Sequence, residues 1–372
     1  MRKKQKNYKL ILVISITLLF IVLRFTVTVF NFISNPKLTR VNRRYADLVS
    51  ILIPARNEED NILKLLQSIY RQDYNNYEVI VYDDDSSDRT YAICSEYAGA
   101  HEGFSVIKGV KLPNGWTGKN YACHQLSKKA TGRYFLFLDA DDSISNGLIN
   151  SAVHRMQAYK LCLLSLLPNQ VMQTAGEKTT VPLMLYIALN LLPLRLVYLT
   201  KTAVIAAACG QFMLFDADVY KQNHWHSQAR DKIVEDAEIM KLVKSASYSG
   251  ELLLANGMVS CRMYKGYREA INGFSKNVLA LFNYSIIGLL LNILLSMGGP
   301  MVVIMTLNFQ LIFFMTGLIV LTRIMTSLSA GQNALYNVIL HPIQMINLVM
   351  IAFLSIQRHL TKTNVWKGRR IN

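Results

Sequence analysis

Carboxylates gather at three places in the sequence, each directly after an apolar run. These places are Glu58 and its neighbours, the run Asp83–Asp85, and the run Asp139–Asp142. One such cluster alone is ordinary, because aspartate is common in turns and at the starts of helices. Three clusters brought together would repel one another unless a cation or a ligand offset their charge. They therefore predict a site that a cation or a ligand occupies.

Two further stretches carry residue types suited to catalysis. Glu235 and Asp236 stand at the start of an expected helix, where a carboxylate could take a proton from an attacking group. The simpler interpretation of this pair is two first-turn acids that the helix dipole favours. The second stretch, GWTGK from Gly115 to Lys119, is a glycine-rich basic turn suited to approach a diphosphate or a sugar.

The elements that would position these residues alternate between strands and helices. Apolar runs such as VSILIPA, YEVIVYD and RYFLFLD alternate with helical patterns such as NILKLLQSIYRQ. This alternation is typical of βαβ units and a mostly parallel sheet. Such sheets bind ligands beyond the carboxyl ends of their strands, and the three acidic clusters are expected there. We therefore predict one α/β domain over residues 47–276.

The same stretches resemble the motifs of the family 2 glycosyltransferases, which use a nucleotide-binding fold of the GT-A type. SILIPARNEE resembles the opening strand and turn of that family, and VYDDDSSDRT resembles its second acidic motif. LDADD resembles its metal-binding D-x-D, and VEDAEI resembles the motif that supplies the catalytic base. Asp85 departs from the family, which usually has glycine there. If the turn needs a positive φ, aspartate tolerates it better than most residues.

The resemblance implies an inverting transfer from a UDP-sugar with Mg²⁺ or Mn²⁺ as cofactor. Asp141 would be the metal ligand, Asp139 would lie at the ribose and the metal, and Asp236 would be the base with Glu235 beside it. The residues implied to bind the donor are Pro54, Ala55, Arg56, Glu58, Asp84, Lys119 and Asp139.

GWTGKNYACHQL, CRMYKGYREAINGF and the tail WKGRR resemble a membrane-bound subgroup that includes hopanoid-associated and carotenoid acid glycosyltransferases. This resemblance implies a hydrophobic acceptor, and we expect glucose transfer to the carboxyl group of a C30 carotenoid acid. The alternative acceptor is a lipid or hopanoid hydroxyl. The Q-x-x-R-W motif of processive synthases is absent, which favours a single transfer. Two other classes are weaker alternatives: an inactive membrane α/β protein and a transporter.

The charge distribution separates a central domain from its flanks. All 24 acidic residues lie between Asp47 and Glu269, whereas ten of the 40 basic residues precede Asp47 and seven follow Glu269. The net charge of +16 therefore comes from the flanks. A nucleic-acid-binding protein would carry its basic residues on the folded domain, so we expect no nucleic-acid partner. Basic residues beside apolar spans indicate a membrane protein. The five cysteines form no C-x-x-C pair, so we expect buried, isolated thiols.

The flanks predict a multi-pass protein of the cell membrane. We expect a basic tail (1–7), an uncleaved anchor (8–33), transmembrane or re-entrant helices (277–356) and a second basic tail (357–372). Gly298-Gly299-Pro300 predicts a hairpin between two spans. The apolar stretch 181–209 is expected as interfacial helices, with core helices as the alternative.

Nucleotide sugars are cytosolic, so the catalytic domain should face the cytoplasm. Three full spans after this domain would then place the basic C-terminal tail outside, against the tendency of basic residues to remain inside. We therefore expect that Leu335–Ile356 does not cross the membrane but lies in the interface or re-enters at His341-Pro342.

Overall fold

A computed structural model describes residues 2–363, 365–366 and 369–370 of the chain. The strands of its main sheet are β1 (Val49–Ala55), β2 (Tyr77–Asp83), β3 (Phe104–Lys108), β4 (Tyr134–Leu138), β6 (Leu163–Leu167), β8 (Phe212–Asp216) and β9 (Gly250–Leu254). Their order is β3-β2-β1-β4-β8-β6-β9. Only β8 runs antiparallel to its neighbours, so the prediction of a mostly parallel sheet is confirmed.

Helices cover both faces of this sheet, which explains why its strands are apolar on both sides. Along β1, Ile51 and Ile53 pack into one layer and Leu52 packs into the other. The first layer contains α2 (Ile62–Tyr70), α3 (Thr90–Ala100) and α5 (Leu148–Tyr159). The second layer contains α4 (Gly118–Lys129), α9 (Ala217–Asn223), α10 (Trp225–Gln228) and α11 (Glu235–Ser245).

A small sheet lies beside the carboxyl end of β4. Its strands are β5 (Asp142–Ile144), β10 (Val259–Cys261) and β7 (Asn169–Gln170), in the order β5-β10-β7. In the antiparallel pairing of β5 with β10, Cys261 lies opposite Asp142. This register brings a distant part of the chain to the acidic cluster after β4.

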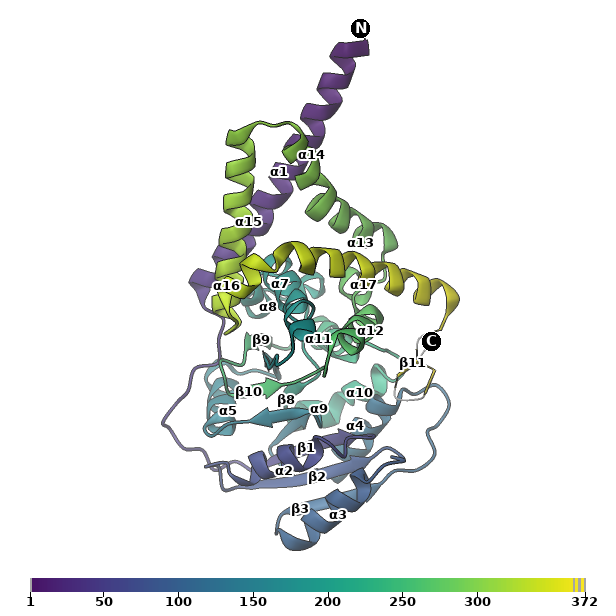
Figure 1. The fold of residues 1–372 in the computed structure, drawn as a ribbon. Coiled ribbons are helices and arrows are strands. Elements are labelled where there is room, and N and C mark those ends of the chain that lie inside the picture. The colour runs from purple at the N-terminus through teal and green to yellow at the C-terminus, as the bar shows by residue number, and fades with distance from the viewer. Residues whose placement is uncertain (1, 364, 367–368, 371–372) are drawn as a thin grey trace.

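The apolar flanks form long helices at one end of the domain (Figure 1). These are α1 (Arg2–Ser34), α13 (Ile286–Ile293), η3 (Leu294–Gly298), α14 (Gly299–Met305), α15 (Phe309–Ser329), α16 (Ala334–Ile339) and α17 (His341–Thr361). Four stretches are long and apolar enough to cross a membrane: 7–34, 286–305, 309–329 and 341–361. The expected N-terminal tail is not separate, because α1 already begins at Arg2. Of the expected C-terminal tail, residues 364, 367–368 and 371–372 lie outside the described residues, which takes in Lys367 and Gly368 of WKGRR.

The hairpin predicted at Gly298-Gly299-Pro300 is wrong. A continuous apolar stretch runs from Ile286 to Met305 through these residues. The π-helical turn η3 precedes Pro300 and accommodates it within the helix. Gly299 lies against Thr17 of α1, so the glycine serves close helix packing rather than a turn. The chain reverses at Thr306–Asn308 instead, where Leu307 has a φ of 55° and Asn308 caps α15.

The stretch 181–209 folds into α7 (Pro182–Leu191), α8 (Leu194–Leu199) and η1 (Ala203–Ile205). Most side chains of α7 are buried, and they pack with α12 (Tyr267–Asn277), η2 (Ala280–Phe282) and α17. Leu199 and Val204, by contrast, are exposed. The interfacial location of this stretch therefore stays a prediction, and α7 has the packing expected of a core helix.

Helix α17 lies across the base of the upright helices α1 and α15, over the α/β domain (Figure 1). It begins at His341 with Pro342 in its first turn, directly after the end of α16. The expectation that this segment does not cross the membrane stays a prediction, since 341–361 is one of the four stretches of spanning length. The short helix α6 (Ala175–Lys178) and the strands β11 (Val365–Trp366) and β12 (Arg369–Arg370) complete the described elements.

Candidate active site

The three acidic clusters meet where the order of the strands changes direction. β1 is central, with β2 on one side and β4 on the other, and each of these strands ends in a polar turn. The backbone N–H of Asp84 donates to the carbonyl of Ala55 over 2.8 Å, which ties the turn after β2 to the end of β1. Crevices at such points are where open α/β sheets bind nucleotides.

Side chains of the turn after β1 form hydrogen bonds with the backbone of the turn after β2. Arg56 donates to the backbone carbonyls of Asp84 and Asp85. The side-chain oxygen of Asn57 accepts from the backbone N–H of Ser87 over 2.9 Å. Asp85 has a φ of 55°, so this turn does use the left-handed conformation in which the resembling family usually has glycine.

The other residues predicted for the donor nucleotide lie at the same edge. Pro54 and Ala55 are the last two residues of β1. Because Ala55 is buried, it could contact a ligand mainly through its backbone atoms. The carboxylate of Glu58 accepts from the side chain of Asn61 over 2.8 Å. The backbone N–H of Glu58 donates to Thr90 over 2.7 Å. Their contacts with uridine stay predictions.

Lys119 connects two of the predicted site residues. Its Nζ atom lies 2.7 Å from Oδ1 of Asp139 and 3.1 Å from Oε1 of Glu235. Burial lowers the pKa of Lys119, but the two carboxylates outweigh it and hold this pKa well above its ordinary value. Lys119 is held in the first turn of α4, which Thr117 caps by accepting from the backbone N–H of Asn120. Lys119 was predicted to approach the diphosphate of the donor. In the structure its ammonium contacts the carboxylates of Asp139 and Glu235.

Asp236 is held at the start of α11 by backbone donors. Its Oδ2 accepts from the N–H of Gly210 over 2.8 Å, and its Oδ1 accepts from the N–H of Ala237 over 2.7 Å. Burial and the neighbouring Glu235 carboxylate raise the pKa of Asp236 above its ordinary value. A carboxylate with a raised pKa is a better proton acceptor near neutral pH. This environment suits the role of base that the sequence predicts.

Gly210 is a site residue that the sequence analysis missed. A Cβ atom there would meet Nζ of Lys119 at 2.9 Å and Oε1 of Glu235 at 3.0 Å. The carbonyl of Gly210 also accepts from Lys119 over 3.3 Å. The absence of a side chain at this position therefore lets the backbone contact both Lys119 and Asp236.

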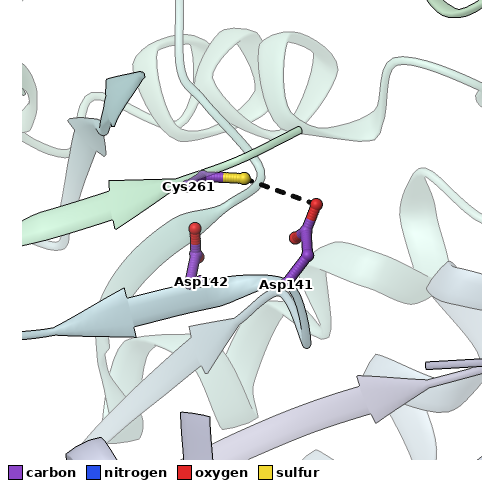
Figure 2. Close-up of side chains that lie close together, drawn as sticks. All are labelled: Asp141, Asp142 and Cys261. Atoms are coloured by element: carbon purple, nitrogen blue, oxygen red, sulfur yellow. Dashed lines mark hydrogen bonds between the residues drawn. The ribbon is translucent and has the colours of Figure 1, made fainter. Parts of the chain in front are cut away.

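Asp141, Asp142 and Cys261 form a compact group beyond β4 (Figure 2). One potential ligand atom from each lies within 4.8 Å of the others. The Cys261 thiol donates to Oδ2 of Asp141 over 3.4 Å. Burial and the charges of Asp141 and Asp142 raise the pKa of this thiol well above its ordinary value, so it stays protonated. Cys261 begins the stretch CRMYKGYREAINGF but was not predicted as a site residue, because 120 positions separate it from Asp141.

The group suits a hard divalent cation. Asp142 is buried, and its Oδ2 accepts no hydrogen bond from any described residue. Burial and the charges of Asp141 and Asp139 raise its pKa well above the ordinary value, although Lys119 acts in the opposite direction. Carboxylate oxygens are the ligands that Mg²⁺ and Mn²⁺ accept. Asp142 was recognised as part of the acidic run but not as a site residue.

Comparisons with known proteins agree with this architecture. Residues 50–224 match the family described as Glycosyl transferase family 2. A 4,4'-diaponeurosporenoate glycosyltransferase of Staphylococcus haemolyticus is 30% identical over 238 residues, which cover 62% of this chain and 60% of the relative. A protein of the same name from Staphylococcus aureus is 29% identical over 240 residues, again 60% of its length. The chain thus matches about three fifths of the length of these curated relatives.

The structure is also similar to a mannosyltransferase, PcManGT from Pyrobaculum calidifontis, solved with GDP-Man and Mn²⁺. The TM-score is 0.56 at 14% sequence identity, and the match covers 95% of this chain and all of that one. This likeness extends the common fold over nearly the whole molecule. The chain therefore carries a Glycosyl transferase family 2 domain with the GT-A fold, to which four apolar helices of spanning length are attached.

Proposed function

We propose that this protein is a membrane-bound, inverting and metal-dependent glycosyltransferase. It transfers glucose from UDP-glucose to a hydrophobic acceptor, the carboxyl group of a C30 carotenoid acid, at the cytoplasmic face of the cell membrane. The names of the curated relatives support this acceptor, and the helices of spanning length support access to a membrane-soluble substrate.

The observation that carries the proposal is the chain of charges through Lys119. Its ammonium lies 2.7 Å from Asp139 on one side and 3.1 Å from Glu235 on the other. Asp139 belongs to the cluster proposed for the donor and metal, whereas Glu235 precedes the proposed base. This arrangement supports a site in which a donor and an acceptor meet.

The roles of the residues follow from charge. The turns after β1 and β2 would bind the nucleotide, and Asp139, Asp141 and Asp142 would hold a Mg²⁺ or Mn²⁺ ion. When bound, this ion offsets the negative charge that grows on the departing diphosphate. Asp236 lies at the acceptor side, where its carboxylate can orient the attacking group and accept a proton from it. Attack from the face opposite the diphosphate inverts the anomeric centre.

A second acceptor class is favoured by the environment of Asp236. A carotenoid acid ionises near pH 4 and attacks without losing a proton to the protein. A lipid or hopanoid hydroxyl needs a base, and the raised pKa of Asp236 suits that need. We therefore keep a hydroxyl acceptor as the alternative.

The function is tested with the full chain in lipid nanodiscs. Labelled UDP-glucose, UDP-galactose, UDP-N-acetylglucosamine and GDP-mannose are each offered with a C30 carotenoid acid or a hopanoid alcohol. We expect a β-glucosyl ester from UDP-glucose alone, lost with EDTA and restored by Mn²⁺ or Mg²⁺. Transfer that persists in EDTA would contradict the metal, and retention of the α-configuration would contradict inversion. A product formed only with the alcohol would select the alternative acceptor.

A further inference from the structure

Tyr284 lies between the α/β domain and the stretch of spanning length that begins at Ile286. Its side chain is 45% exposed, and the side chains of Leu281 and Ile287 on either side of it in the chain are also exposed. Its ring stacks on His359 near the end of α17, with 5.9 Å between the ring centroids. A phenol with apolar neighbours therefore lies where we expect the surface of the membrane.

The turn that carries Tyr284 contacts the helix that carries the proposed base. Nζ of Lys241 in α11 donates to Oδ1 of Asn283 over 3.3 Å. Asp236 lies in the first turn of the same helix. Burial and, after it, the charge of Asp236 raise the pKa of Tyr284. The phenol is therefore close enough to interact with the proposed base, and it keeps its proton at neutral pH.

The backbone of this turn is strained at the tyrosine. Asn283 and Tyr284 have φ values of 50° and 60°. Asparagine tolerates the left-handed conformation, but a bulky aromatic residue rarely adopts it. Glycine or asparagine would form the same turn with less strain, so the turn alone does not account for a tyrosine. Strained residues are concentrated at binding and active sites, and Tyr284 borders one.

A carboxylate acceptor placed beside Asp236 needs a hydrogen-bond donor, because the two groups carry like charges. Lys119 is already engaged by two carboxylates. Lys241 lies 3.6 Å from the carboxylate of Glu238. The hydroxyl of Tyr284, by contrast, forms no hydrogen bond with any described residue. It is therefore a donor that an acceptor can use.

We propose that Tyr284 positions the acceptor, with its hydroxyl donating to one oxygen of a long-chain carboxylate while the other oxygen attacks. The apolar chain of the acceptor passes along Leu281 and Ile287 into the membrane. The attacking oxygen forms a bond to the anomeric carbon, the bond from that carbon to the diphosphate breaks, and UDP leaves with the electron pair. No proton moves, because the acceptor is already ionised. This inference rests on the proposed function and names a residue that selects an acid.

Tyr284→Phe keeps the ring and removes the hydroxyl. With the full chain, the KM for the carotenoid acid should rise roughly tenfold or more, the usual effect of losing a hydrogen bond to a charged group. The KM for UDP-glucose should change little. Tyr336→Phe is the matched control, because Tyr336 is 49% exposed in α16 and its ring lies against Lys178. An unchanged KM for the acid in Tyr284→Phe, or an equal rise in Tyr336→Phe, would overturn the proposal.

Tyr284→Asn separates positioning from a role in the fold. Asparagine relieves the strain of the left-handed conformation, so the melting temperature should not fall. The KM for the carotenoid acid should rise at least as much as in Tyr284→Phe. A tyrosine needed only for the turn, or only as an anchor in the membrane surface, would instead lower the melting temperature and leave this KM unchanged. That result would contradict the proposed role.

A photoreactive long-chain fatty acid tests the site without relying on sugar transfer. The acid should crosslink to residues 279–287, compete with the unlabelled carotenoid acid, and lose its crosslink in Tyr284→Phe, whereas the matching alcohol should crosslink less. If the wild-type protein transfers no sugar but the crosslink depends on Tyr284, the proposed function is wrong and the site remains. If wild-type protein and Tyr284→Phe transfer to the acid with the same KM and give the same crosslinks, the site is wrong and the function remains.

Discussion

The ammonium of Lys119 lies 3.1 Å from Oε1 of Glu235, so an ion pair joins the first turn of α4 to the first turn of α11. Asp139 holds the same ammonium from the other side. Because Glu235 directly precedes Asp236, the charge of Lys119 also acts on the proposed base, whose pKa it lowers in opposition to burial. The donor cluster and the base therefore share one cation.

Replacing Lys119 by Gln should slow transfer about tenfold or more at neutral pH and move the acid limb of the rate to higher pH. Lys119 lowers the pKa of Asp236, so without this cation the neighbouring Glu235 carboxylate and burial raise that pKa further. The pH–rate profile measures this shift. Lys128→Gln is the control, because Lys128 is exposed at the other end of α4. An unmoved acid limb in Lys119→Gln would contradict the shared cation.

The pH dependence of the wild-type protein follows from Asp236, whose pKa burial and Glu235 raise to about 6. A base works when it is deprotonated, so the rate of transfer to a hydroxyl acceptor should be highest above this pKa. The rate should fall as the pH drops through this value. Measuring kcat/KM between about pH 5 and about pH 8 tests this expectation, because the pH dependence of kcat/KM reports the pKa values of the free enzyme. A flat profile with a hydroxyl acceptor would remove Asp236 from the role of base.

Asp236→Asn distinguishes the two acceptor classes. With a carotenoid acid the loss should stay below about tenfold, because that carboxyl group is already ionised at neutral pH. With a lipid hydroxyl the loss should reach roughly 10²–10⁴-fold, the usual contribution of a general base. Initial rates with both acceptors measure the difference. A collapse of about three orders of magnitude with the acid would show that Asp236 has another role there.

Asp141→Ala should abolish transfer and leave the fold intact. Asp141 belongs to a cluster of like charges that raises the pKa of Asp142, so its removal relieves repulsion instead of opening a cavity in the core. Circular dichroism and the rate at saturating Mn²⁺ measure the two effects. Asp231→Ala, on the exposed loop before α11, is the control. Turnover above about a tenth of the wild-type rate would exclude Asp141 as an essential ligand.

The arrangement of the helices predicts the side of the membrane for two turns. The start of α1 and the α14–α15 turn lie at the same end of the molecule, away from the α/β domain, and α17 lies between that domain and the upright helices (Figure 1). With the domain in the cytoplasm, a cysteine placed at Leu307 should be labelled by an impermeant reagent in intact cells. A cysteine at Lys362 should be labelled only after permeabilisation. Labelling at Lys362 in intact cells would show that α17 crosses.

The centre of the main sheet could be predicted from the sequence because three of its strands are short apolar runs followed by polar turns rich in acids. VSILIPA, YEVIVYD and RYFLFLD contain β1, β2 and β4. Periodicity does not reveal direction, so β8, whose apolar sequence FMLFD resembles that of a parallel strand, gave no sign that it runs antiparallel. The direction of a strand depends on the path of the chain between elements, which here passes through α7 and α8.

The site residues that lie in local motifs could be predicted from the sequence. Contacts that depend on the pairing of distant strands could not. Asp141 and Asp236 lie in motifs, but Cys261 reaches Asp141 only because β10 pairs with β5. The hairpin was misplaced for a related reason. Gly299 looked like a turn residue, yet its missing side chain is used against Thr17 in a helix contact that no local pattern encodes.

The packing around Gly210 restricts which residues can replace Gly210, Lys119 and Glu235. Its backbone lies against the ion pair of Lys119 and Glu235, where the space for a Cβ atom is already occupied. A larger residue can enter position 210 only if one of those two partners shortens or moves. The three positions, widely separated in the sequence, are therefore constrained to change together.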